Sequence, residues 1–158
     1  MPIDQPPETD RPVAGPRLSP SLSNHVGYLL GQAHLQAFAL ATLALEDDGL
    51  TPKHFGALTM ISEGGPVSQS ALVERSRIDR STMVTVIDDL EAAGYVERRR
   101  NPADRRAYAL EVTPAGAEWL RWAGRALRAA EGEMTHGLSV DEREQLVGLL
   151  QRLLAGSA

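Results

Sequence analysis

The fold of this chain is most constrained by a change of hydrophobic period in its second half. Three short helical segments, at residues 51–64, 68–75 and 79–93, are followed by two segments of strand character, at 95–98 and 107–112. In the last segment Tyr108, Leu110 and Val112 alternate with smaller or polar residues, which is typical of a half-buried strand. Residues 99–104 have turn composition. We therefore expect short helices followed by a β-hairpin with a long tip.

The remaining apolar patterns predict three longer helices, at residues 22–46, 113–136 and 139–154. Local signals mark the helix starts: N-caps at Thr51, Ser68, Asp79 and Thr113, and a capping box from Ser139 to Glu142. The helix at 22–46 is apolar on nearly every face. A small domain has little interior for such a helix, which favours a partner subunit.

The composition is that of an ordinary globular protein. The 158 residues are 42% hydrophobic and 23% charged, which fits one domain, expected at 21–158. Six of the ten prolines lie in residues 1–20, which predicts a flexible tail. The lack of cysteine excludes disulfides and thiolate chemistry. The sequence has no signal-peptide pattern and no membrane-spanning run, so we expect a cytoplasmic protein without a membrane partner.

The distribution of charge favours a nucleic-acid partner more than the net charge does. The chain carries −5 overall, yet residues 75–106 hold eight of the 16 basic residues, all arginine, against six acidic residues. A locally positive segment in an acidic protein is a candidate DNA-binding surface. Aromatic residues make up only 4%, which argues against recognition of single strands by stacking.

The helix expected at 79–93 has the surface of a helix that enters the major groove. At about 100° per residue, one side collects Met83, Ile87 and Leu90. The other side carries Ser81, Thr85 and Asp88, with Thr82 beside them and Arg80 at the flank. Short hydroxyl side chains can donate to and accept from base edges, and arginine can read guanine or hold phosphate. The alternative is an ordinary amphipathic helix with a solvated face.

The expected hairpin adds a second basic element. Its tip is flanked or occupied by arginines, among them Arg98, Arg99, Arg105 and Arg106. A basic tip can enter the minor groove or hold phosphates. The alternative is that these arginines only improve solubility and form local ion pairs with Glu97 and Asp104.

Four motifs in residues 71–116 together carry a family resemblance. They are Asp-Arg-Ser-Thr from residue 79, Asp-x-Leu-Glu-x-x-Gly ending at Gly94, Arg-Asn-Pro-x-Asp-Arg-Arg in the hairpin, and Leu-x-Val-Thr-x-x-Gly ending at Gly116. With them the chain resembles the MarR family of transcriptional regulators over about residues 22–155. The resemblance implies a mainly α fold with a small β-hairpin wing (α+β). This is a winged helix-turn-helix with an α-helical dimerisation layer.

The resemblance also implies a homodimer that binds double-stranded DNA. Residues 51–113 would form the DNA-binding part, and helices at 22–47 and 114–155 would form the dimer. The helix at 79–93 would enter the major groove, and the wing would enter the minor groove, where Asp104 steadies Arg106. A two-fold dimer requires a pseudo-palindromic operator with half-sites about 34–36 Å apart. The function implied is that of a ligand-responsive repressor, although the sequence leaves repression and activation open.

The residue pattern and the family resemblance together indicate which side chains are expected to form the DNA-binding surface. They are Ser68, Gln69, Arg77, Arg80, Ser81, Thr82, Thr85, Arg98, Arg99, Arg100, Asp104, Arg105 and Arg106.

The resemblance further implies a small aromatic or lipophilic effector, held between the dimerisation helices and the winged part. Six side chains that offer donors or rings on apolar walls are candidates: His25, Tyr28, Gln32, His54, Phe55 and Trp122. An ordinary core position is the alternative for each. The family's peroxide sensors need a cysteine and its zinc sensors need metal ligands on the fifth helix. Because this helix has no histidine before His136, no metal or other cofactor is expected.

Two other classes of function compete with this one. An enzyme is not expected, because the sequence has no phosphate loop with lysine, no His-Glu-x-x-His and no Gly-x-Ser-x-Gly. The second class is a protein-interaction module that keeps the winged fold without operator binding. Salt separates this interpretation from DNA binding, because phosphate contacts weaken steeply as salt rises.

Overall fold

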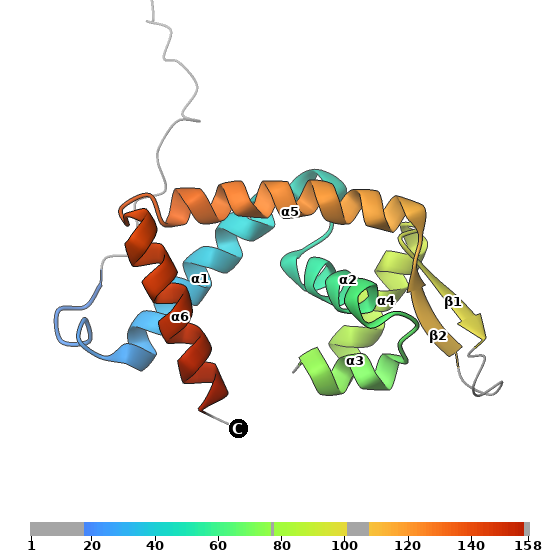
Figure 1. The fold of residues 1–158 in the computed structure, drawn as a ribbon, viewed down its shortest axis with the longest axis horizontal. Helices are drawn as coiled ribbons and strands as arrows, with labels where there is room; N and C mark the ends of the chain where they lie inside the picture. The colour runs from blue at the N-terminus through green and yellow to red at the C-terminus, as the bar shows by residue number, and fades with distance from the viewer. Residues whose placement is uncertain (1–17, 77, 101–107, 157–158) are drawn as a thin grey trace, which may run out of the picture. The chain divides into compact units, whose positions relative to one another are not determined.

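The computed structural model describes residues 18–76, 78–100 and 108–156. The elements run in the order α1 (Val26–Ala44), the 3-10 helix η1 (Glu46–Asp48), α2 (Pro52–Gly64), α3 (Gln69–Ser76), α4 (Arg80–Ala92), β1 (Val96–Arg100), β2 (Tyr108–Val112), α5 (Pro114–Met134) and α6 (Val140–Ala155) (Figure 1). This mainly helical fold with one hairpin confirms the predicted fold class. Among the described residues, no helix is long and apolar enough to cross a membrane.

The chain divides into two units at a boundary inside α1, between Gln36 and Ala37. In the first unit a turn precedes the helix, because the Leu22 backbone N–H donates to the carbonyl oxygen of Ser19 at 3.0 Å. The helix therefore begins at Val26 rather than at the predicted residue 22. Of the predicted tail, residues 1–17 lie outside the described residues. No residue of α1 is buried, although its sequence is apolar on nearly every face.

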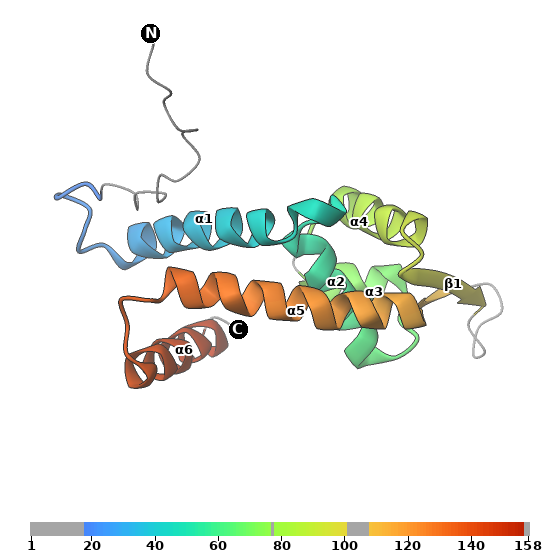
Figure 2. The same cartoon turned by 90° about the horizontal axis from the view of Figure 1, so that it is seen from above.

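In the second unit the core surrounds α2, which packs against α4, α5 and β2. Figure 2 shows α2, α3 and α4 gathered beside the half of α5 that follows the hairpin. The largest fully buried side chains are Leu45, Leu58, Ile61, Leu72, Met83, Ile87 and Leu90. The predicted inward side of the helix at 79–93 is thus confirmed. Burying one side of α4 leaves the opposite side of that helix exposed.

The hairpin is antiparallel, with Val96 opposite Val112, Arg98 opposite Leu110 and Arg100 opposite Tyr108. Two predictions need correction here. Residues 99 and 100 belong to β1 rather than to the turn, because the hairpin ladder extends to them. Tyr108 is 57% exposed rather than packed inward, because the buried part of this strand face ends at Leu110 and Tyr108 lies two pairs further out. The predicted tip, residues 101–107, lies outside the described residues.

The helix starts follow the predicted caps. The Ser68 hydroxyl oxygen accepts from the Ala71 N–H at 3.2 Å, and the Ser139 hydroxyl oxygen accepts from the Glu142 N–H at 3.3 Å. The Glu142 carboxylate in turn accepts from the Ser139 N–H at 2.8 Å, which completes the capping box. These short-range bonds set the helix boundaries locally, which is why the sequence predicts them.

Candidate nucleic-acid interface

The start of α4 is held by Asp79. One carboxylate oxygen of Asp79 accepts from the Thr82 backbone N–H at 2.9 Å and from the Ser81 hydroxyl at 2.6 Å. The bond from Ser81, and then the bond from Thr82, hold the pKa of Asp79 well below its ordinary value. This cap orients the first turn of α4, where the exposed side chains of Arg80 and Ser81 lie.

We expect Asp79→Ala to destabilise the protein at neutral pH, and the difference from the unchanged chain to shrink below the ordinary aspartate pKa of 3.8. A carboxyl whose folded pKa is depressed stabilises fully above its unfolded pKa. That contribution is lost as pH falls through the folded pKa. Urea denaturation at a series of pH values measures the difference in the free energy of unfolding between the two proteins. Asp79→Asn is the control, since asparagine caps without titrating. A difference that does not change with pH would contradict this account.

Three predicted side chains come together beside a shallow groove of about 370 Å³. Its lining residues are Ser68, Gln69, Ser70, Val73, Arg80, Val84 and Tyr108. Polar groups from the starts of α3 and α4 therefore share one surface with two exposed apolar side chains. The sequence reasoning missed Val84 and Tyr108, which are 40% and 57% exposed. The helical period could have predicted that Val84 is exposed, because one position beyond the buried Met83 is a turn of about 100° around the helix.

The acidic side chains of α4 are engaged with neighbouring elements. Arg98 of β1 donates from Nε to a Glu91 carboxylate oxygen at 2.6 Å and from Nη2 to an Asp88 carboxylate oxygen at 2.8 Å. Asp89 accepts from the His54 ring of α2. The carboxylates on the second half of this helix therefore tie it to the hairpin and to α2.

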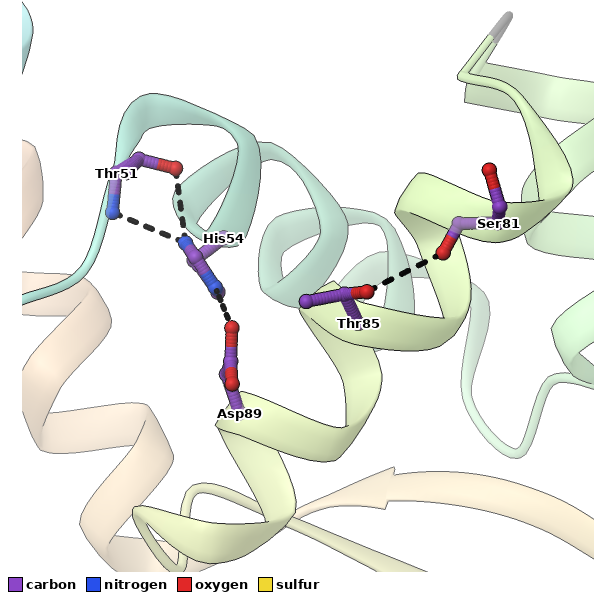
Figure 3. A network of polar contacts seen from close by, with 5 residues as sticks. All are labelled: Thr51, His54, Ser81, Thr85 and Asp89. Atoms are coloured by element: carbon purple, nitrogen blue, oxygen red, sulfur yellow. Dashed lines mark hydrogen bonds and ion pairs between the residues drawn. The ribbon is translucent and has the colours of Figure 1, made fainter.

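His54 is 6% exposed, and its ring bridges two elements (Figure 3). The Thr51 backbone N–H donates to its Nδ1 at 3.0 Å, and the Thr51 hydroxyl oxygen lies 2.9 Å from the same nitrogen. Nδ1 therefore acts as an acceptor, so Nε2 carries the proton and donates to Asp89 at 3.1 Å. Figure 3 also shows Thr85 and Ser81, which precede Asp89 on α4. The Thr85 hydroxyl donates to the Ser81 carbonyl oxygen.

The arginines of β1 differ in their surroundings. Arg99 pairs with Glu97 at 2.6 Å and with Glu111 at 3.4 Å, and these carboxylates, Glu97 first, raise its pKa. The local ion pair with Glu97 that the alternative expects is therefore present at Arg99. Arg100 is exposed, and no acidic side chain of the described residues pairs with it. Four predicted residues, Arg77, Asp104, Arg105 and Arg106, lie outside the described residues.

The six effector candidates are divided between the two units. His25, Tyr28 and Gln32 belong to the first unit, where the Tyr28 hydroxyl oxygen accepts from the Ser19 N–H at 3.4 Å. In the second unit Phe55 lines an apolar pocket of about 240 Å³ formed by Ala37, Leu40, Ala41, Pro52, Phe55, Leu127, Ala130, Glu131 and Met134. His54 binds Thr51 and Asp89 instead of lining this pocket. Trp122 packs on Trp119, with ring centroids 6.5 Å apart.

A helix-turn-helix followed by a two-stranded hairpin defines the winged helix class of proteins. Comparison with known proteins identifies the family within this class. The model of the MarR family matches residues 48–107. A protein of Thauera aromatica assigned to transcriptional regulation of the hcr operon is 35% identical over 84% of this chain and 81% of its own length. The chain belongs to the MarR family of transcriptional regulators. This confirms the family predicted from the motifs of residues 71–116.

Two solved structures of similar fold are described together with a ligand. BpsR of Bordetella bronchiseptica, described with regulation of its DNA binding by 6-hydroxynicotinic acid, has a TM-score of 0.74 and 28% identity, over 83% of this chain and 94% of that one. A cysteine-to-serine variant of MarR from E. coli, complexed with operator DNA, has a TM-score of 0.72 and 25% identity, over 81% of this chain and 92% of that one.

Proposed function

We propose that this regulator is a homodimeric, ligand-responsive repressor that binds a pseudo-palindromic operator in double-stranded DNA. The observation that carries the proposal is the first half of α4, where the exposed Ser81 and Thr85 and the half-buried Thr82 lie beside Arg80 on a helix start held by Asp79. In the proposal this half enters the major groove and the hairpin reaches the adjacent minor groove. The operator complex of the MarR variant supports operator binding by a protein of this fold.

The proposal divides the chain by role. Residues 51–113 bind DNA, and the helices over 22–47 and 114–155 form the dimer. Support comes from apolar side chains left exposed on α1 and α6: Val26, Leu29, Leu30, Leu35, Phe38, Leu43, Val140, Leu146, Val147, Leu149, Leu153 and Leu154. So many exposed apolar groups on two helices indicate a protein interface.

The proposed effector is a small aromatic or lipophilic compound, and its candidate site in the second unit is the apolar pocket beside Phe55. A volume of about 240 Å³ suits a ligand of about one ring. The aromatic acid with which the BpsR structure is described supports this class of effector. Glu131 is the charged residue among the lining residues, so an acid bound there would direct its carboxylate away from that side chain.

Selection of bound duplexes from a random pool, followed by anisotropy titration at two salt concentrations, tests the proposed function. We expect one pseudo-palindromic motif to be enriched, a stoichiometry of two chains per site, and a loss of affinity of several orders of magnitude between about 50 and 200 mM salt. Scrambled duplexes are the control. Selection without an enriched motif would overturn operator binding. It would favour the protein-interaction module, which the ion pairs of Arg98 and Arg99 make a specific second candidate.

We expect Thr85→Ala to relax the preference for one base pair in each half-site. Losing a hydroxyl that faces a base edge costs about 1–3 kcal/mol of discrimination and leaves non-specific affinity nearly unchanged. Affinities for single-base variants of the selected operator measure the effect. Thr59→Ala is the matched control, because it removes the same type of hydroxyl bond, to the Phe55 carbonyl oxygen on α2. Equal weakening on all sequences would place Thr85 against phosphate instead.

A further inference from the structure

Arg98 connects the hairpin to α4 through two separate carboxylates. Its Nε donates to Glu91 at 2.6 Å and its Nη2 donates to Asp88 at 2.8 Å. The two acids are three residues apart, which puts them on one face of the helix. A planar guanidinium can hold two such partners in one geometry, which the ammonium of lysine does not do.

The charges of this cluster are unsuited to holding a phosphate. One positive guanidinium faces two carboxylates, so a phosphate that approached it would meet two negative groups. The Arg98 and Glu91 side chains are 35% and 32% exposed, so the bond between them is only partly screened by solvent, whereas Asp88 is 58% exposed. Arg100, two residues further along the same strand face, is exposed and has no acidic partner among the described residues.

The position of the cluster determines what it can do. Val96 anchors the base of the hairpin in the core. Further along the same face of β1 come Arg98, which is opposite Leu110, and then Arg100, which is opposite Tyr108. Among the described residues, the bonds from Arg98 to Asp88 and Glu91 therefore join the outer part of the hairpin to α4. On the same helix, Asp89 binds His54 of α2, so α4 is held from two sides.

We propose that Arg98 is a positioning residue that braces the hairpin against α4 and does not bind DNA phosphate. The brace fixes the separation between the two elements that, in the proposed function, enter adjacent grooves. The structural part of this inference concerns the free protein alone. The effect on operator binding rests on the proposed function.

The first test keeps the charge constant. Arg98→Lys retains a cation but loses the two-partner geometry, and Arg121→Lys, at an exposed arginine of α5 outside the candidate interface, is the matched control. We expect Arg98→Lys to lower operator affinity about tenfold, the size of one mismatched base pair, without changing non-specific affinity. Arg121→Lys should change both by less than about twofold, since its exposed pair with Glu118, at 4.0 Å, contributes little. Full operator affinity in Arg98→Lys would overturn the proposal.

The second test separates a brace from a phosphate contact. Arg98→Glu places three acids together, whereas Arg98→Glu with Glu91→Arg rebuilds the same three charges with their positions exchanged. We expect the single variant to lose operator binding and the double variant to recover it. Arg98→Gln should leave the salt dependence of non-specific binding unchanged, whereas a lost phosphate contact lowers the slope by about 0.9. Failure of the double variant to recover, or a lower slope, would contradict the brace.

The third test needs no DNA. Hydrogen exchange of the free protein should be faster in Arg98→Gln for peptides of the hairpin, with peptides of α2 unchanged. Equal hairpin exchange in the two proteins would overturn the brace. If the unchanged chain selects no operator but this acceleration is seen, the proposed function fails and the brace stands.

Discussion

Gly116→Ala is expected to destabilise the protein by about 3 kcal/mol, because the added methyl group meets backbone that has no room to move. A Cβ at Gly116 would overlap the carbonyl oxygen of Tyr95. That carbonyl already accepts from the Thr113 N–H at 3.0 Å, and the Thr113 hydroxyl donates to the Gly94 carbonyl oxygen at 2.7 Å. The start of α5 is thus locked to the start of β1.

Urea denaturation at fixed protein concentration measures the loss for Gly116→Ala. Gly132→Ala, on the same helix with nothing within 4 Å of the added group, is the matched control. It should gain about 0.5–1 kcal/mol through the helix preference of alanine over glycine. Similar stabilities for the two variants would show that the junction between β1 and α5 yields to the methyl group.

Leu149→Glu is expected to weaken the proposed dimer by at least about a hundredfold. Leu149 is 50% exposed on α6, and burying a leucine contributes about 1.5–3 kcal/mol, counted twice at a two-fold interface. A buried, unpaired carboxylate adds to the loss. Operator affinity should fall with dimerisation, because one protomer reads only one half-site.

Sedimentation equilibrium over a range of concentrations measures the dimer constant of Leu149→Glu. Gln151→Glu is the control, since it makes the same charge change about 200° around the helix, where the side chain is also exposed. An unchanged dimer in Leu149→Glu would move the proposed interface away from this side of α6. Equal losses in both variants would point to net charge instead.

The local features of the fold could be predicted from the sequence. Asp79 caps α4, Ser68 caps α3, and Met83, Ile87 and Leu90 are buried, as their spacing indicates. Caps and helical periods depend on residues three or four positions apart, so they can be read without the fold. The hairpin could be predicted as well, but its strand length could not. The ladder that includes Arg99 and Arg100 depends on pairing with residues across the turn.

Only the tertiary structure showed which groups the side chains of the candidate interface contact. Arg98 could be identified as basic, but its two acids lie on another element and became partners only through the packing of β1 beside α4. The sequence made His54 a candidate for an effector pocket. The structure adds that His54 bridges to Asp89, which is 35 residues away.

The sequence by itself therefore determined the order of the elements, their caps, the family and the polar face of α4. These follow from periodicity and from contacts within one helical turn. The tertiary structure decided which arginines are held by carboxylates, that Val84 and Tyr108 stay exposed beside Arg80, and that Gly116 must lack a side chain. Each of these depends on how closely separate elements approach, a distance that no local pattern encodes.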